Sequence, residues 1–211
     1  MAGRKGQVQK RGVERRRAII DAAIRLFSQY GFRGTGFAAI AEQAGVTPST
    51  VVHHFATKEI LLQAVIEEND ARVVARLAEL GKNQTGVLRA LEAMVHDARM
   101  SVEDPTVASL YIVIETENLS QDSEVRAFFL RRSRMIRKHL AELLREGIRT
   151  GEVRAGVDAD AKAREIHAFV EGAHLQWLLD PEEIDLVALY RSYVDSLIPQ
   201  LAAEWPGRKK P

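Results

Sequence analysis

Helical periodicity is the feature that most restricts the fold of this 211-residue chain. Apolar residues recur at three- and four-residue spacings in one segment after another, and no segment alternates apolar and polar residues as a half-buried strand does. Residues 13–30 are typical, with Ile20, Ile24 and Phe27 on one face. The pattern predicts an all-α protein of about nine helices, separated mainly by glycine and proline.

Capping signals define several of the expected helix ends. Gly31 ends the first helix, because glycine adopts the left-handed backbone of a C-cap without steric cost. Thr47 should cap the third helix with Pro48 at its first position, and Thr57 should cap the fourth. Helices are expected at residues 13–30, 37–44, 48–55, 58–80, 86–102, 106–119, 123–150, 158–179 and 182–203, with a loop at residues 81–85.

Composition removes several classes of function. The chain has no cysteine, which excludes disulfides and cysteine-based zinc or thiol chemistry. The basic start of the sequence has no apolar run behind it, so it is not expected to be a signal peptide. The longest strongly apolar run, residues 107–114, is far too short to cross a bilayer. These features predict a cytoplasmic protein with no membrane partner.

The net charge of +1 hides a strong asymmetry along the chain. Residues 1–58 carry ten Lys or Arg against three acids, a net of +7, whereas residues 59–211 carry a net of −6. A basic N-terminal segment followed by an acidic remainder indicates that only the N-terminal segment binds a polyanion. Residues 1–12 are expected to form a basic, flexible arm.

Residues 43–57 contain no Asp, Glu, Lys or Arg, although the chain as a whole is 28% charged. They lie across two short helices joined by a tight turn at Gly45, the pattern of a helix-turn-helix at about residues 36–55. A helix in the DNA major groove would be repelled by carboxylates, whereas Ser, Thr and His can donate hydrogen bonds to phosphates and bases. The backbone N–H groups at the start of this helix, residues 47–50, have no partner within the helix and can also bind a phosphate.

This region resembles the DNA-binding region of the tetracycline-repressor (TetR) family, in order and in spacing, from about Val13 to Asn69. The matching residues are Ala23, Leu26, Phe27, Gly31, Gly34, Thr35, Ile40, Ala41, Ala44, Gly45, Val46, Thr47, Phe55, Lys58, Leu61 and Leu62. The resemblance implies an all-helical, two-domain, dimeric repressor that binds a double-stranded DNA operator. It also implies release from the operator when a small-molecule inducer binds the C-terminal domain.

On this resemblance, residues 13–73 form the DNA-binding domain and residues 74–204 the ligand-binding and dimerisation domain, followed by a tail at 205–211. Phosphate contacts carry over to Thr35, Thr47, His54 and Lys58. The sequence departs from the family at Val52, where members usually have a phosphate-binding tyrosine, and at Ala38, often a polar base reader. Sequence choice is therefore expected to rest on Pro48, Ser49, Thr50 and His53.

The last two predicted helices each carry a wide apolar face with aromatic residues. In proteins similar to this family the final two helices pair with their counterparts in a second copy, although an intramolecular core would give the same pattern. A repressor that reads two half-sites needs a symmetric partner, which favours dimerisation. The residues expected at the dimer interface are His174, Trp177, Leu178, Tyr190 and Val194.

A ligand pocket is predicted around the helix at residues 106–119, where Glu115 and Glu117 follow an apolar run. A carboxylate on a mostly buried helix must be exposed, paired or facing a cavity, and arginines that could pair with it are present. The candidate pocket residues are His96, Met100, Tyr111, Glu115 and Phe128.

Two other classes of function remain as alternatives. His167, Glu171 and His174 share one helical stripe that could bind a metal, so a helical-bundle metal-dependent enzyme is one alternative. The chain has no second Glu-x-x-His motif and no nucleophile–base constellation, so neither a metal, a cofactor nor an enzyme activity is expected. The other alternative is a protein that coats DNA without sequence preference.

Overall fold

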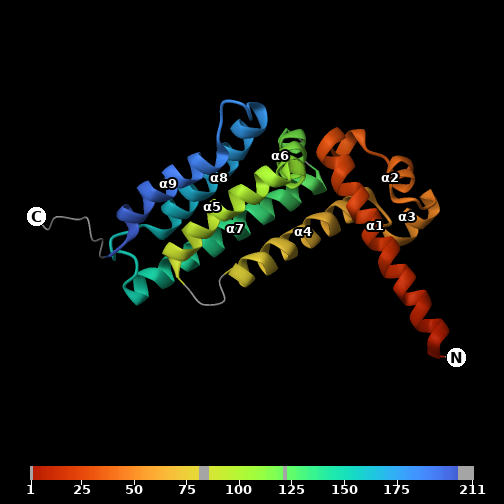
Figure 1. Ribbon diagram of the computed structural model, residues 1–211, viewed down its shortest axis with the longest axis horizontal. Helices are drawn as coiled ribbons and strands as arrows, with labels where there is room; N and C mark the ends of the chain where they lie inside the picture. The colour runs from red at the N-terminus through yellow and green to blue at the C-terminus, as the bar shows by residue number, and fades with distance from the viewer. Residues whose placement is uncertain (1, 81–85, 121–122, 204–211) are drawn as a thin grey trace, which may run out of the picture. The chain divides into compact units, whose positions relative to one another are not determined.

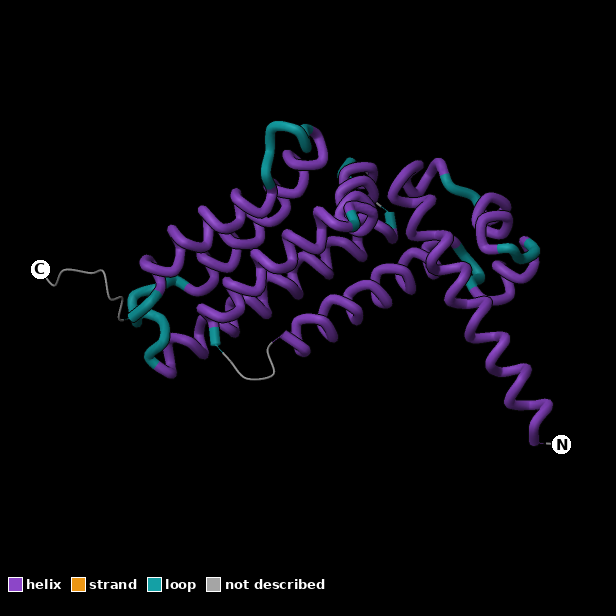
Figure 2. Tube along the Cα trace, viewed as in Figure 1, coloured by secondary structure: helices purple, strands orange, loops and turns teal. Residues whose placement is uncertain are grey.

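The computed structural model describes residues 2–80, 86–120 and 123–203, so the predicted loop at 81–85 and the predicted tail at 205–211 lie outside the described residues. The described residues form nine α-helices and no strand (Figures 1 and 2). The helices are α1 Ala2–Gly34, α2 Phe37–Ala44, α3 Pro48–His54, α4 Lys58–Leu80, α5 Val87–Glu103, α6 Pro105–Asn118, α7 Glu124–Thr150, α8 Ala159–Leu179 and α9 Leu186–Leu201. The all-α prediction is confirmed.

Two helix starts differ from the prediction. Residues 2–12, predicted as a flexible arm, continue α1 as helix, in keeping with the straight-chain Arg, Lys and Gln residues in this segment, which favour helix. The last helix begins at Leu186 and not at residue 182. Asp185 is its N-cap, because the Asp185 carboxylate accepts a hydrogen bond of 2.9 Å from the Ala188 amide.

The chain divides into two compact units. One unit comprises residues 1–74 and 106–128, and the other comprises residues 75–105 and 129–211. The prediction placed residues 106–128 with the C-terminal domain, whereas here they cluster with the DNA-binding region. Hydrogen bonds contribute to this grouping. The Tyr111 hydroxyl on α6 donates to Asp70 at 2.8 Å and accepts from Asn69 at 2.9 Å, and both partners lie on α4.

The first unit is built around the buried face of α1, as the three- and four-residue spacing predicts. Ile19, Ile20 and Phe27 are at most 1% exposed, and α2 packs on α1 while α3 packs on α2. Each such side chain contributes about 1.5–3 kcal/mol when fully buried. The other buried apolar residues of α2, α3 and α4 include Ile40, Ala41, Val51, Leu61, Leu62 and Val65. This core fixes the geometry of the helix-turn-helix.

In the second unit α5, the second part of α7, α8 and α9 run alongside one another (Figure 1). The apolar face of α9 packs against α5 and α8 of the same chain, and Tyr190 and Val194 are at most 2% exposed. Trp177 on α8 is 7% exposed. These three residues were predicted at the dimer interface, but their own protomer already buries them.

The remaining two residues of the predicted interface are half-buried. The His174 ring lies within 3.0 Å of the Tyr190 hydroxyl and 3.2 Å of the Ser101 hydroxyl, so its polar atoms are used within the chain. Leu178 is partly exposed. None of the nine described helices has the length and hydropathy that crossing a membrane would require.

Candidate nucleic-acid interface

The turn between α2 and α3 is fixed by backbone geometry and by one hydroxyl. Gly45 has φ 66° and ψ 34°, the left-handed conformation that glycine adopts without steric cost, and its amide bonds to the last turn of α2. Thr47 then caps α3 by accepting a hydrogen bond of 3.3 Å from the Thr50 amide, with Pro48 at the first helical position. The predicted cap and turn are confirmed.

One face of α3 is buried and the other is open to solvent. Val51 is fully buried, whereas Pro48, Ser49 and His53 are exposed and the Val52 side chain is 50% exposed. The Thr47 hydroxyl lies 2.9 Å from the hydroxyls of both Ser49 and Thr50. The helix therefore presents small hydroxyls, one imidazole and one methyl-bearing side chain, and no carboxylate. These are groups that can contact phosphates and base edges.

The surroundings of α3 are positively charged. The Arg16 guanidinium on α1 stacks 5.4 Å from the centre of the Phe55 ring, at the end of α3. Partial burial lowers the pKa of His54, and repulsion from His53, Arg16 and Arg15 lowers that pKa further. Two arginines and a second histidine thus act on one imidazole, as expected beside a surface that binds a polyanion. A phosphate placed here would offset this repulsion and raise the His54 pKa again.

Thr35, predicted as a phosphate contact, is part of the core. It is 2% exposed, and its hydroxyl donates to the carbonyls of Gly31 at 2.8 Å and Leu26 at 3.1 Å. Both carbonyls lie at the end of the regular part of α1. The hydroxyl closes this helix end, so we do not carry Thr35 forward as a phosphate contact.

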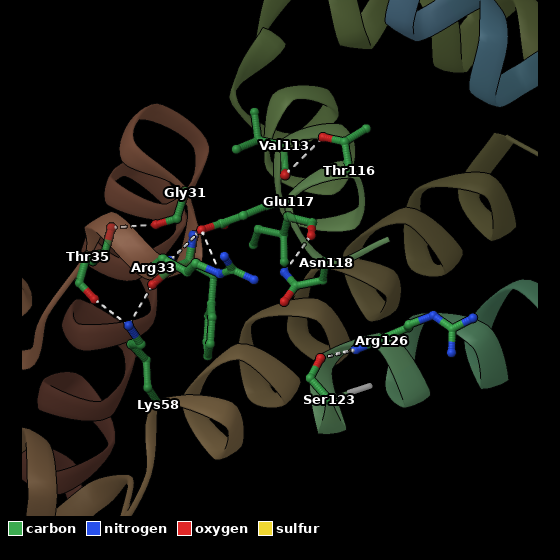
Figure 3. Close-up of polar contacts among 12 residues, drawn as sticks. Gly31, Arg33, Thr35, Lys58, Val113, Thr116, Glu117, Asn118, Ser123 and Arg126 are labelled. Carbon is green, nitrogen blue, oxygen red and sulfur yellow. Dashed lines mark hydrogen bonds and ion pairs between the residues drawn. The ribbon is translucent and has the colours of Figure 1, made fainter. Parts of the chain in front are cut away.

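Lys58, also predicted as a phosphate contact, is held within the protein. Its ammonium donates to the carbonyls of Phe32 at 2.6 Å and Thr35 at 2.9 Å, and it lies 4.5 Å from the centre of the Phe32 ring (Figure 3). Two of its three donors are therefore used. The geometry assigns Lys58 to fixing the turn before α2, and the phosphate role is withdrawn.

Replacing Lys58 with Met should lower the stability of the protein by about 1–3 kcal/mol, because two buried carbonyls lose their donor. The variant should bind DNA with an almost unchanged salt dependence once it is folded. The measurement is urea unfolding together with DNA affinity at several salt concentrations. The control is Arg15→Met at an exposed position, which should leave stability unchanged and lower the salt slope by about one charge. A reduced salt slope in Lys58→Met without loss of stability would restore its phosphate role.

Glu117 on α6 plays a role that the sequence did not reveal. Its carboxylate accepts hydrogen bonds from the Phe32 amide at 2.7 Å and the Arg33 amide at 2.9 Å, and lies 3.7 Å from the Arg33 guanidinium (Figure 3). Gly31 makes this approach possible, since a Cβ there would lie 2.8 Å from a Glu117 oxygen. Glu117 thus fastens α6 to the residues that lead into the helix-turn-helix.

The predicted ligand-pocket residues are divided between the two units. Tyr111, Glu115 and Phe128 belong to the first unit, and His96 and Met100 to the second. Tyr111 is bound to α4 through Asn69 and Asp70, as described above. The pocket therefore stays a prediction.

The histidine stripe of α8 is used for other contacts. His167 lies 3.4 Å from Glu171, whereas the His174 ring bonds to the Val170 carbonyl as well as to Tyr190 and Ser101. Within the part of the chain that the structure describes, no three His, Cys, Asp or Glu residues are grouped so that they could hold a metal.

The arrangement defines a class of protein: a helical transcription regulator with an N-terminal helix-turn-helix. Comparison with known proteins agrees. Residues 19–65 match the family model of bacterial regulatory proteins of the tetR family, and residues 116–199 match that of the BetI-type transcriptional repressor C-terminal region.

Relatives match over almost the whole chain. The regulatory protein RaaS of Mycobacterium tuberculosis is 31% identical over 90% of this chain and 84% of its own length. The fatty acid metabolism regulator of Bacillus subtilis is 26% identical over 85% and 92%. A solved structure of FadR from Bacillus subtilis with stearoyl-CoA has the same fold, with a TM-score of 0.75, 24% identity and coverage of 87% and 97%. The chain belongs to the TetR family of transcriptional regulators.

Proposed function

We propose that this protein is a repressor that binds a palindromic operator as a homodimer and is released by a small-molecule inducer. The observation that carries the proposal is the exposed, carboxylate-free face of α3, set beside Arg15 and Arg16 of α1. Such a helix fits the major groove, and a single copy touches only a few base pairs. Two copies are therefore needed to mark one site in a genome.

Within α3 we assign two kinds of contact. The base-reading residues are Pro48, Ser49, Thr50 and His53, together with Val52, whose exposed methyl groups suit the methyl group of thymine. The phosphate contacts are Thr47 and His54, with Arg15 and Arg16 added in place of Thr35 and Lys58. Compared with the sequence prediction, this assignment drops Thr35 and Lys58, whose polar atoms already form hydrogen bonds within the protein, and adds Val52, Arg15 and Arg16.

We place the dimer interface on the faces of α8 and α9 that point away from the core of their own unit. On α8 the exposed positions Ala161, Ala168, Leu175 and Leu179 recur at spacings of seven and four residues, and the last two are large and apolar. On α9 the exposed residues Ala188 and Ser192 are small. Small side chains let helices of two copies approach closely, as in four-helix packing.

We assign the inducer to the C-terminal part of the chain and keep His96 and Met100, which belong to the second unit, as candidate contacts. Support comes from solved relatives of the same fold that hold small molecules, stearoyl-CoA in one and triclosan in another. We propose no catalytic activity and no cofactor, and we place the protein in the cytoplasm, where its DNA is. An inducer would raise the thermal midpoint by mass action, so a thermal-shift screen can find it.

Selection from random double-stranded DNA tests the operator proposal. The protein should enrich a palindrome, and it should bind that palindrome at least about a thousandfold more tightly than random DNA at the same salt concentration. His53→Ala should relax the preference at one base pair of each half-site, by about 1–3 kcal/mol. The measurement is fluorescence anisotropy with a set of single-base operator variants.

The control is Gln29→Ala, an exposed change on α1 about 20 Å along the helix from Arg16. It should leave every affinity unchanged. If the protein bound the palindrome and random DNA equally at matched salt, it would be a DNA-coating protein, and the repressor proposal would fail.

A further inference from the structure

A cleft between α7 and α8 has an unusual charge. Its volume is about 240 Å³, and the side chains that line it are Arg134, Arg137, Lys138, Arg145, Asp160 and Arg164. Five of these six carry a positive charge. Residues 59–211 as a whole have fewer Lys and Arg than Asp and Glu, 20 against 26, so the lining is more basic than the average of this region. The positive charge is concentrated at one place of the acidic body.

Internal pairing neutralises only part of this charge. Arg145 forms an ion pair with Asp160, the one carboxylate in the lining, and Lys138 lies 3.7 Å from Glu142. Arg137 donates to the hydroxyl of Ser133, which is uncharged. Arg134 and Arg164 are exposed and neither forms an ion pair with a described residue, although Arg164 and Arg145 both help to lower the pKa of Asp158. At least three positive charges of the cleft therefore lack a carboxylate at ion-pair distance among the described residues.

The positive charge of α7 also affects the pKa of a histidine on α8. Burial is the main cause that lowers the pKa of His167, while Glu171 raises it, and Arg137 and Arg132 lower it again. Two arginines on α7 thus repel a proton from His167 on α8, in spite of the carboxylate 3.4 Å from its ring.

The size of the cleft limits what it could take. Pockets for drug-sized molecules usually have about 300–1,000 Å³ and mostly apolar walls. This cleft is smaller, is lined by charged side chains, and is partly open, since the Arg145 and Asp160 side chains are 52% and 58% exposed. It fits a compact charged group and not a whole apolar effector. Guanidinium groups suit the oxygens of a phosphate, which they contact through two parallel hydrogen bonds.

We propose that the α7/α8 cleft is a binding site for a small phosphate-class anion with two or more negative charges. Arg134, Arg137 and Arg164 supply the donors, and the Arg145–Asp160 pair bounds the site at one end. The site lies within the second unit and is separate from the helix-turn-helix, so it does not depend on the operator proposal.

Isothermal titration calorimetry of the full-length dimer with inorganic pyrophosphate tests the proposal, at constant ionic strength set with sodium chloride. We expect saturable binding, weakened at least tenfold in the double variant Arg134→Gln, Arg164→Gln. These two side chains have no ion pair with a described residue, so the variant should keep the thermal midpoint of the wild type. Binding of pyrophosphate at the basic N-terminal region would persist in this variant and can be subtracted.

The matched control is Arg149→Gln, which removes a positive charge from the exposed end of α7, outside the cleft, where Arg149 pairs with Glu146. It should bind pyrophosphate as the wild type does. Three results would overturn the proposal: equal affinity of the wild type and the double variant, an equal loss in Arg149→Gln, or the absence of saturable binding at millimolar pyrophosphate.

Discussion

Replacing Val194 with Asp should unfold the second unit, with a loss of about 3–5 kcal/mol in the free energy of unfolding. Val194 is fully buried where α9 packs on α5 of the same chain. A carboxylate placed there would lose its hydration and gain no partner, which is among the most damaging single changes. Because a domain has only about 5–15 kcal/mol of stability, this loss should remove most of the folded protein at 37 °C.

The measurement is urea unfolding followed by far-ultraviolet circular dichroism, with Ser196→Asp as the matched control. Ser196 is exposed on the same helix two residues later, so the same charge there should change the stability of the fold by less than about 0.5 kcal/mol. If Val194→Asp kept wild-type stability and became monomeric, Val194 would belong to the dimer interface as the sequence alone suggested.

The helices were largely predictable because their signals are local. The periodicity of apolar residues, Gly45 at the turn, and Thr47 with Pro48 at the start of α3 each act within a few residues of the chain. The beginning of α9 was misplaced by four residues because Glu182 and Asp185 both precede an apolar run, and the sequence alone does not decide which begins the helix.

The sequence did not show which helix covers each apolar face. α9 has a wide apolar surface, and periodicity gives its width but not whether a helix of the same chain or of a second copy covers it. Packing of α9 on α5 places Tyr190 and Val194 in the intramolecular core. The exposed residues of α8, Ala168 and Leu175 among them, carry a weaker apolar signal and were passed over.

The candidate DNA contacts show the same limit. Ser49 and His53, which the sequence analysis assigned to base reading, are exposed on α3. Thr35 and Lys58 were assigned to phosphates, yet each bonds to carbonyls at the end of α1. For Lys58 these bonds span 23 and 26 residues, and no pattern in the sequence announces them.

The most specific of these distant contacts joins Glu117 to the backbone beside Gly31. Gly31 has φ 73° and ψ 173°, a conformation open almost only to glycine, so any other residue there costs about 1–3 kcal/mol in backbone strain. An added Cβ would also lie 2.8 Å from a Glu117 oxygen and would push the carboxylate away from the Phe32 and Arg33 amides. Loss of a hydrogen bond to a charged group costs a further 1.5–3 kcal/mol or so.

Gly31→Ala should therefore destabilise the first unit by about 3–5 kcal/mol and lower DNA affinity with it, because these residues lead directly into α2. Gly12→Ala is the matched control, since Gly12 lies in α1 with no neighbour within 4 Å of an added Cβ, and it should stabilise the helix slightly. In a Glu117→Ala background the clash is gone, so Gly31→Ala should cost only the backbone strain. The double-mutant cycle from urea unfolding measures this difference. Additive losses would mean that Gly31 and Glu117 act independently, and that α6 is not fastened to the helix-turn-helix through this contact.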